Sequence, residues 1–322
     1  MALDLAGLTA YIEENRENLM TKAILGSTFL NHVTVIDNVK SSVKVADLES
    51  TVPFQAGAGC NTVTTSGTTS MTQVSLATSP IEFTEKICLQ TFEDYFTQKY
   101  LPSGAKPESV SIFSDIVNRK MARIALQVEQ MAFQGRTTTG NSTILKQIDG
   151  YIRRVDVASD EVITSGGGAG TALTTSTIKG VIHQMIYQDM PNAVYGKNPV
   201  LLMGMENYRI YLQKLAEDNA FNYFPSAGDL QANRVLIPGT NIYAYGIAGL
   251  NNDTPVDTGT LPAIYKNRMI LTYKENLLWG IDSASDFTSL DTWYEKKDRA
   301  IYIYGRFRAG TAVRYTDHVV TY

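Results

Sequence analysis

The feature that most constrains this chain is a long segment without charge near its N-terminal end. From Ser50 to Ile81 the sequence contains no Asp, Glu, Lys or Arg, and 13 of these 32 residues are Ser or Thr. Residues that favour strands recur throughout the segment: Val52, Phe54, Val63, Met71, Val74 and Leu76. A disordered polar linker is the competing interpretation. The recurring strand formers favour two Thr-rich strands over 61–76, joined by a turn at Ser66-Gly67.

Such a hairpin is too long to stay within its own subunit. With about 15 residues per strand and ~3.3 Å per residue, it would reach roughly 50 Å. A compact chain of 322 residues has a radius of gyration of about 20 Å. An isolated hairpin is marginally stable in water, and this one has no charges to protect its edges. We therefore predict that the segment rests on a neighbouring copy of the chain.

Composition bounds the class of protein. An apolar content of 44% predicts a folded chain, and a net charge of −4 argues against a protein that coats nucleic acid by neutralising phosphates. Two cysteines, Cys60 and Cys88, without a CxxC pattern favour folding in a reducing compartment. The N-terminus does not resemble a signal peptide, and no apolar run approaches the ~20 residues that cross a bilayer. We expect a soluble protein that is retained inside a cell.

Apolar periodicity predicts the main elements of the N-terminal half. A helix is expected over 5–25, with Leu8 and Ile12 on its apolar face. Short strands are expected at 33–36 and 43–45, and another at 81–88. The clearest helix spans 109–134 and would be roughly 39 Å long at ~1.5 Å per residue. Its apolar stripe consists of Phe113, Val117, Met121, Ile124, Val128 and Met131.

The C-terminal half mixes short helices with strands. A turn into a strand is expected at 148–152, and the Gly-rich run 165–170 is expected to be flexible. Helices are expected at 175–188, capped by Thr175 or Ser176, and at 205–217. Strands are expected at 199–203, 235–247 and 262–281. The C-terminus predicts a ribbon buried on one face, with the apolar set Ile301, Ile303, Phe307, Ala309 and Val313 opposite Tyr302, Tyr304, Arg306, Arg308 and Arg314.

No set of residues predicts catalysis or a metal site. His32, His183 and His318 do not have the spacing of metal ligands, and the run 166–170 lacks the Gly-Lys-Ser/Thr of a phosphate-binding loop. We interpret Cys60 as a structural loop cysteine, and Asn251-Asn252-Asp253 as a turn, because no Glu follows at the spacing of a calcium loop. We therefore predict no enzyme, no cofactor and no metal.

The order of these parts resembles the major capsid proteins of tailed double-stranded DNA bacteriophages. The parts are the N-terminal helix, the uncharged hairpin, the helix Ser109 to Gln134, the turn Asp149-Gly150-Tyr151 and the final ribbon from Asp298 to Gly310. The resemblance implies an α+β capsid fold in five regions. They are an N-terminal arm (1–48), an E-loop (49–81), a peripheral domain with the spine helix (82–146), an axial α/β domain (147–284) and C-terminal strands that return to the peripheral domain (285–322).

The resemblance also implies a structural role. Family members form the hexamers and pentamers of an icosahedral shell, assembled in the host cytoplasm, that encloses the genome of the virion. The implied partners are further copies of the chain, a scaffolding protein, a portal, decoration proteins and packaged DNA bound without sequence specificity, and no membrane. Some members join a Lys on the E-loop to an Asn on a neighbour. No lysine lies between Lys44 and Lys86, so we predict no such crosslink.

Seven residues are predicted to contact a neighbouring subunit: Leu8, Ile12, Phe54, Met71, Leu76, Arg306 and Arg308. The arginines form a row of cations with Arg314, and pairing with acids of the same or a neighbouring subunit is favoured over contact with DNA phosphates. Two other functions stay open. One is an encapsulin-like shell around a cargo enzyme. The other is an extracellular β-rich adhesion or surface-layer protein, which the Thr-rich segments would suit.

Overall fold

A computed structural model describes most of the chain. The described residues are 28–54, 67–88, 112–137, 144–158, 162–163, 171–218, 225–252, 266–282, 290–298 and 300–322. The expected helix at 5–25 and the Gly-rich run 165–170 lie outside these ranges. Across the ranges just given, every helix is too short or too polar to span a bilayer.

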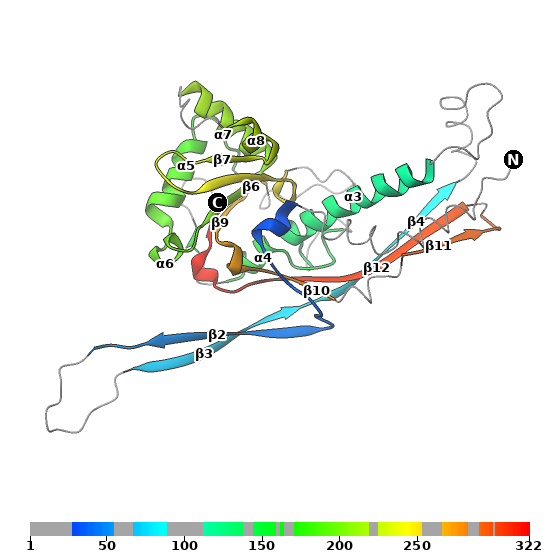
Figure 1. The fold of residues 1–322 in the computed structure, drawn as a ribbon, viewed down its shortest axis with the longest axis horizontal. Helices are drawn as coiled ribbons and strands as arrows, with labels where there is room; N and C mark the ends of the chain where they lie inside the picture. Colours follow the sequence, from blue (N-terminus) through cyan, green and yellow to red (C-terminus); the bar gives the residue numbers. More distant parts are fainter. Residues whose placement is uncertain are drawn as a thin grey trace.

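The molecule is elongated, with two sheets and a protruding hairpin (Figure 1). The first sheet runs in the order β1 (Thr34–Ile36), β10 (Leu277–Ile281), β12 (Ala300–Val313) and β11 (Leu290–Glu295), and β4 (Ser79–Cys88) also pairs with β12. Strand β12 pairs antiparallel with β4 along the register from Ala300↔Cys88 to Ala309↔Ser79. The predicted strands at 33–36 and 81–88 and the predicted ribbon are confirmed.

The two faces of β12 differ as the sequence pattern predicts. Ile301, Ile303 and Phe307 are buried, whereas Arg306 is exposed and Tyr302, Tyr304 and Arg308 are partly exposed. The buried face packs against α3 (Ile112–Gln134) in one apolar core that includes Val128 and Met131. The predicted spine helix is confirmed.

A short helix replaces one predicted strand. The expected turn into a strand at 148–152 is wrong, because Tyr151–Asp156 forms helix α4. Its buried residues Tyr151, Ile152 and Val155 have the spacing of one helical face. The Tyr151 hydroxyl donates a hydrogen bond to the Leu278 carbonyl oxygen at 3.0 Å, which ties the helix to the first sheet.

The second sheet carries most of the short helices. Its order is β5 (Val162–Ile163), β13 (Val320–Thr321), β9 (Met269–Thr272), β6 (Val200–Gly204), β8 (Tyr243–Ile247) and β7 (Arg234–Leu236). The helices near it are α5 (Ile178–Gln184), which continues as a π-helical turn (Met185–Asp189), α6 (Asn192–Tyr195), α7 (Met205–Glu217) and α8 (Ala227–Gln231). Single 3-10 turns are found at Thr28–His32, Ala248–Leu250, Lys274–Asn276 and Thr316–His318.

Most predictions for this region are confirmed, including the helix at 205–217 and the strand at 199–203. The predicted cap at Thr175 or Ser176 is wrong. Helix α5 begins after Thr177, and this N-cap makes no side-chain capping hydrogen bond. A second apolar core, which contains Tyr211, Leu201 and Met269, joins α5 and α7 to the sheet.

The hairpin pairs different residues from those predicted. Strand β3 (Thr68–Ala77) pairs antiparallel with β2 (Ser42–Thr51), from Ser42↔Ala77 to Thr51↔Thr68. The predicted pairing within 61–76 about Ser66-Gly67 is therefore wrong, and the expected E-loop start at residue 49 lies inside β2. The physical reason is the apolar pairing at the base, where Val43 lies opposite Leu76 and Val45 opposite Val74.

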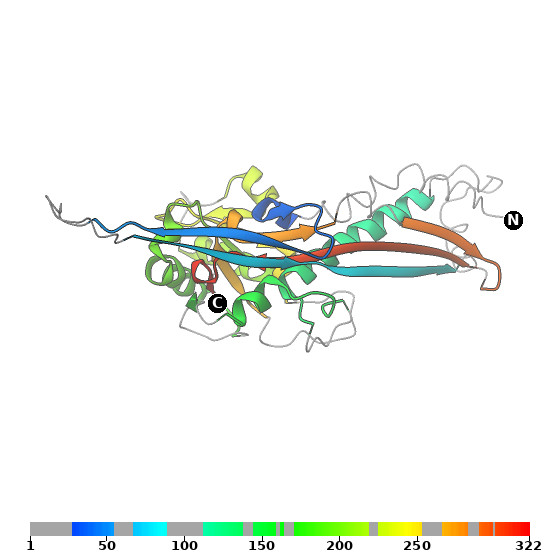
Figure 2. The same cartoon turned by 90° about the horizontal axis from the view of Figure 1, so that it is seen from below.

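Seen from below, the β2–β3 hairpin and the β4–β11–β12 ribbon extend in opposite directions along the long axis (Figure 2). We call the two sheets with their helices the body. The hairpin projects beyond the body at one end of the molecule, and the tip of the ribbon lies at the other end (Figure 1). The two extensions of one subunit therefore do not meet.

Candidate assembly surfaces

The base of the β2–β3 hairpin is anchored by an apolar cluster. Leu76 is fully buried together with Val39, Leu278 and Ala312, and Val43, Val45 and Val74 pack against this cluster. The prediction that Leu76 contacts a neighbour is wrong, because its side chain lies in the core of its own subunit. In a strand that is buried on one face, the alternation of side chains carries this body-facing stripe from Val43 to Val45 and on to residue 47.

An ion pair follows the apolar cluster along that stripe. Asp47 is 8% exposed, and its Oδ1 lies 3.1 Å from Nη2 of Arg314. Arg314 comes directly after the last residue of β12. The carboxylate of Asp47 also forms a hydrogen bond with the side chain of Tyr315. The hairpin is thus joined to the C-terminal segment by a charged contact as well as by apolar packing.

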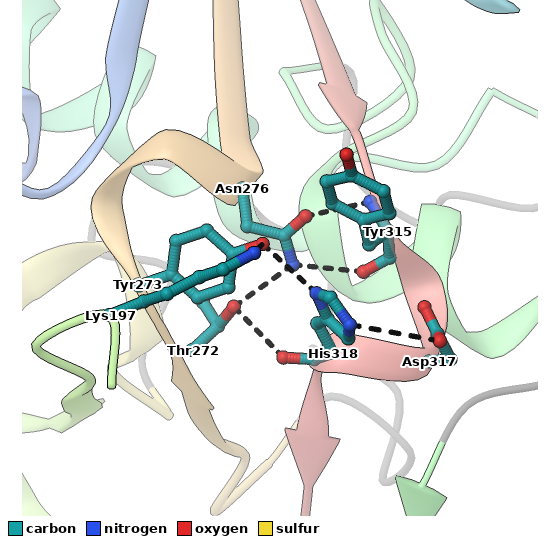
Figure 3. Close-up of polar contacts among 7 residues, drawn as sticks. All are labelled: Lys197, Thr272, Tyr273, Asn276, Tyr315, Asp317 and His318. Carbon is teal, nitrogen blue, oxygen red and sulfur yellow. Dashed lines mark hydrogen bonds and ion pairs between the residues drawn. The ribbon is translucent and has the colours of Figure 1, made fainter. Parts of the chain in front are cut away.

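Buried Asn276 holds the main chain of Tyr315 in place (Figure 3). Its Oδ1 accepts a hydrogen bond from the Tyr315 N–H at 2.7 Å, and its Nδ2 donates to the Tyr315 carbonyl oxygen at 2.9 Å. Its own carbonyl accepts from the Arg314 N–H at 2.9 Å. Nδ2 also donates to the hydroxyl of Thr272 on β9 at 3.0 Å.

Aromatic rings and a lysine surround the hydrogen bonds that Asn276 makes (Figure 3). Nζ of Lys197 lies 4.7 Å from the ring centroid of Tyr273 and 5.3 Å from that of Tyr315. The Tyr273 hydroxyl lies 3.0 Å from Nδ1 of His318. Burial raises the pKa of both Tyr273 and Tyr315 to about 12, so both rings stay neutral at physiological pH and act as hydrogen-bonding and cation-binding surfaces.

The outer half of the hairpin (50–54 and 67–73) is exposed on both faces. Phe54 is 100% exposed, Val52 71% and Met71 65%. The paired strands Ser50–Thr51 and Thr68–Thr69 are joined by the backbone ladder, and the hydroxyls of Ser50 and Thr69 lie 3.5 Å apart. Phe54 and Met71 are thus placed where a predicted contact with a neighbour requires them to be.

A second exposed surface lies on the outer face of the ribbon. Trp293 of β11 is 43% exposed and stacks on Tyr302 of β12, with ring centroids 5.5 Å apart. Lys86 of β4 lies 5.8 Å from the Tyr302 centroid and pairs with Asp298 at 2.8 Å. The sequence pattern did not predict this aromatic patch, because the two rings come from neighbouring strands and only the strand register brings them together.

The three arginines of the predicted row have different surroundings. Arg314 pairs with Asp47 of its own subunit, as one of the two predicted alternatives requires. Arg308 donates to the main-chain carbonyl of Lys40. Arg306 is exposed and lies opposite Glu82, whose Oε2 accepts a hydrogen bond from the Tyr304 hydroxyl at 3.0 Å. Contacts of Arg306 and Arg308 with a neighbour stay predictions, and Leu8 and Ile12 lie outside the described residues.

Within the described residues, no group of three or more His, Cys, Asp or Glu side chains lies close enough together to hold a metal ion. His32 packs its ring against Tyr245 with centroids 4.2 Å apart, and burial, with a smaller effect from Lys274, lowers its pKa to about 4. His183 packs edge-on against Tyr187 with centroids 5.5 Å apart, and His318 lies beside the Tyr273 hydroxyl, so the three histidines lie in three different surroundings.

Comparison with known proteins finds likeness in structure and not in sequence. No family model and no curated protein matches the sequence. A chain in the procapsid of satellite phage P4, solved with its size determination protein Sid, has a TM-score of 0.60 at 13% identity and covers 96% of this chain and 89% of its own. A chain in the capsid of Myoviridae phage XM1 has a TM-score of 0.54 at 14% identity, covering 92% and 91%. A chain from Gordonia phage Cozz also has 0.54 at 14%, covering 92% and 86%.

Proposed function

We propose that this chain, whose α+β fold is that of tailed-phage major capsid proteins, is the structural subunit of an icosahedral shell. Copies of it assemble into hexamers and pentamers around a double-stranded DNA genome, in the host cytoplasm, and remain in the virion. It works by burying surface between copies and not by catalysis. Two of the similar structures are described as a procapsid and a capsid, which supports this assignment.

The observation that carries the proposal is the exposure of the outer half of the hairpin on both faces. A two-stranded ribbon without a supporting surface is marginal in water, and exposed paired strands with apolar side chains promote association between chains. A second copy of the chain supplies the missing surface. Phe54 and Met71, which are 100% and 65% exposed, are the apolar residues that would be buried there.

The shape of the subunit supports a head-to-tail arrangement. The hairpin extends at one end of the molecule and the ribbon tip at the other (Figure 1). A contact between unlike surfaces repeats from copy to copy and forms a closed ring when the rotation between copies allows it. Each subunit then makes several contacts at once, so that contacts of modest strength add up to a stable shell.

The same fold suggests how the chain divides into domains and which partners it has. We assign the first sheet and α3 to a peripheral domain and the second sheet with its helices to an axial domain. This assignment differs from the expected ranges, because β10 lies within 147–284 but belongs to the first sheet, and β13 lies within 285–322 but belongs to the second sheet. A scaffolding protein, a portal and decoration proteins are the expected additional partners, and packaged DNA would touch the inner face without sequence specificity.

Shortening the hairpin tests the proposal directly. Residues 52–67 are replaced by Asn-Gly, a two-residue turn that joins the directly opposed Thr51 and Thr68. This change spares Leu76, whose loss would damage the core of the subunit. We expect a soluble subunit with the circular dichroism and melting temperature of the parent that forms no particles in electron microscopy. Normal particles from the shortened chain would overturn the proposal.

A point variant refines the test. Phe54→Asp places a charge at the fully exposed position and should also abolish particles, because the contact would have to bury an unpaired carboxylate. Lys44→Gln, at an exposed position of the same hairpin, is the matched control and should assemble normally. Purified particles that protect DNA from nuclease would identify a genome shell, whereas protein cargo without DNA would identify the encapsulin-like alternative.

A further inference from the structure

We infer that the ion pair between Asp47 and Arg314 is the positioning contact that sets the direction of the β2–β3 hairpin relative to the body. The inference rests on the proposed function, in which the hairpin must reach a neighbouring copy. It adds to that function the residues that aim the hairpin. Nothing in the sequence pattern points to this pair, because the two residues are 267 positions apart.

Asp47 occupies the decisive place along the hairpin. The body-facing stripe of β2 begins with Val43 and Val45, which are partly buried, and continues with Asp47, which is 8% exposed. Farther out, from Ser50 to Phe54, the residues are exposed, and so are Thr68–Gln73 on the partner strand. Among the residues of β2 whose burial is described, Asp47 is the outermost one that is buried against the body. Because it lies farthest from the base, a contact at Asp47 restricts the direction of the hairpin more than a contact nearer the base does.

Arg314 is held in place for this contact by groups that do not belong to the hairpin. The main-chain N–H of Arg314 and both polar main-chain groups of Tyr315 are bound by Asn276, which is fully buried. The guanidinium carbon of Arg314 also lies 5.4 Å from the ring centroid of Tyr315. A side chain whose backbone and ring neighbour are fixed loses little freedom when it binds a carboxylate, so the pair has a defined geometry.

Apolar packing alone does not define the angle of the hairpin. The cluster around Leu76 attaches the base of the hairpin to the body, and the base also has hydrogen bonds, from the Val39 N–H to the Ile281 carbonyl at 2.9 Å and from Arg308 to the Lys40 carbonyl. All of these contacts lie at the base, whereas the Asp47–Arg314 pair lies farther out along β2. A hydrogen-bonded ion pair is directional, and its partial burial protects it from screening by salt. Without the Asp47 carboxylate, the hairpin should therefore stay attached to the body and keep its strand pairing, but it should take up a range of orientations in place of one.

Distance measurements between spin labels test the inference on the unassembled subunit. The labels are placed at Met71→Cys on the hairpin and Tyr195→Cys on α6, which are 65% and 63% exposed, in a background with Cys60→Ser and Cys88→Ser. We expect one narrow distance distribution for the otherwise unchanged chain. Asp47→Ala should broaden this distribution severalfold, and Asp47→Glu, which keeps the carboxylate, should restore most of its sharpness.

Two controls separate positioning from a general loss of structure. Lys44→Gln removes a charge from the same strand and should leave the distribution narrow. The melting temperature of the body should be the same in Asp47→Ala as in the parent, since both large apolar cores lie elsewhere. A distribution as narrow in Asp47→Ala as in the parent would overturn the inference.

Assembly of the variant gives the second readout. Particles of Asp47→Ala should be fewer and uneven in diameter, because the relative angle of neighbouring copies sets the curvature of a shell. Particles of normal yield and uniform diameter would also overturn the inference. Failure of the unchanged chain to form any particle contradicts the proposed function instead, so the two outcomes are distinguishable.

Discussion

At the scale of single residues, one partly buried histidine makes the subunit sensitive to acid. His32 is the last residue of the 3-10 turn Thr28–His32 and packs against Tyr245, and burial, with a smaller effect from Lys274, lowers its pKa from 6.5 to about 4. The unfolded chain binds a proton at this position below pH 6.5, while the folded chain stays unprotonated until about pH 4. The contribution of His32 to folding is therefore complete above pH 6.5 and is lost as the pH falls toward 4.

We predict that His32→Phe flattens this part of the pH profile. Phenylalanine keeps an aromatic ring against Tyr245 and cannot be protonated. The difference between the free energies of unfolding at pH 7.5 and pH 4.5 should shrink by roughly 1–2 kcal/mol, after allowance for partial exposure. Urea denaturation of the unassembled subunit at both pH values measures it. Parallel pH profiles for the two proteins would contradict the prediction.

At the scale of elements, α3 changes from a surface helix to a core helix along its length. Asn118 and Arg119 are exposed, whereas every residue from Val128 to Gln134 is buried. Buried Glu129 accepts a hydrogen bond from the Gly249 N–H at 2.9 Å, which joins this end to the turn after β8. Burial raises the pKa of Glu129. The C-terminal end of the helix therefore carries most of its contribution to stability.

We predict a graded response to truncation along this helix. Met131→Ala removes a side chain that is 3% exposed and should lower the free energy of unfolding by about 2–5 kcal/mol. Ile124→Ala, at a partly exposed position of the same stripe, should cost less than half as much. Urea denaturation of the unassembled subunits gives both values. Equal losses of the free energy of unfolding would contradict the prediction.

Local periodicity predicted this helix and β12, because each presents one long apolar stripe. It did not predict α4, which is only six residues long and rich in residues that also favour strands. The partner of β3 was also missed, since strand pairing depends on residues distant in sequence. The Asp47–Arg314 pair and the Trp293–Tyr302 stack were missed for the same reason. Exposure of Phe54 and Met71 followed from the sequence, but burial of Leu76 did not.

At the scale of the whole molecule, the position of the lysines decides whether copies can be joined covalently through the hairpin. The structure places Lys44 near the base of the hairpin, opposite Ser75. The hairpin therefore does carry one amine, although the sequence suggested that it carries none. The outer half carries none, since the next lysine along the chain is Lys86. An amine at the base lies away from the end that reaches a neighbour.

We therefore predict that mature particles contain no covalent crosslinks between subunits. Boiling in detergent should release a single band at the mass of the chain, 35.5 kDa. A ladder of multiples of this mass would contradict the prediction. If a ladder appeared and Lys44→Gln removed it, the base of the hairpin would be identified as the donor site.

Strand β12 links the strands at the ribbon tip to strand β10 within the first sheet. Its first residues pair with β4 and β11 at the ribbon tip, and its last residues pair with β10 before the chain reaches Arg314. Tension applied through the hairpin therefore reaches the first sheet by two routes, through the Asp47–Arg314 ion pair into β12 and along the main chain from β3 through Thr78 into β4, which pairs with β12. A pull on the hairpin is transmitted to the ribbon tip at the opposite end of the molecule through the main chain and the backbone hydrogen bonds of β12 with β4 and β11.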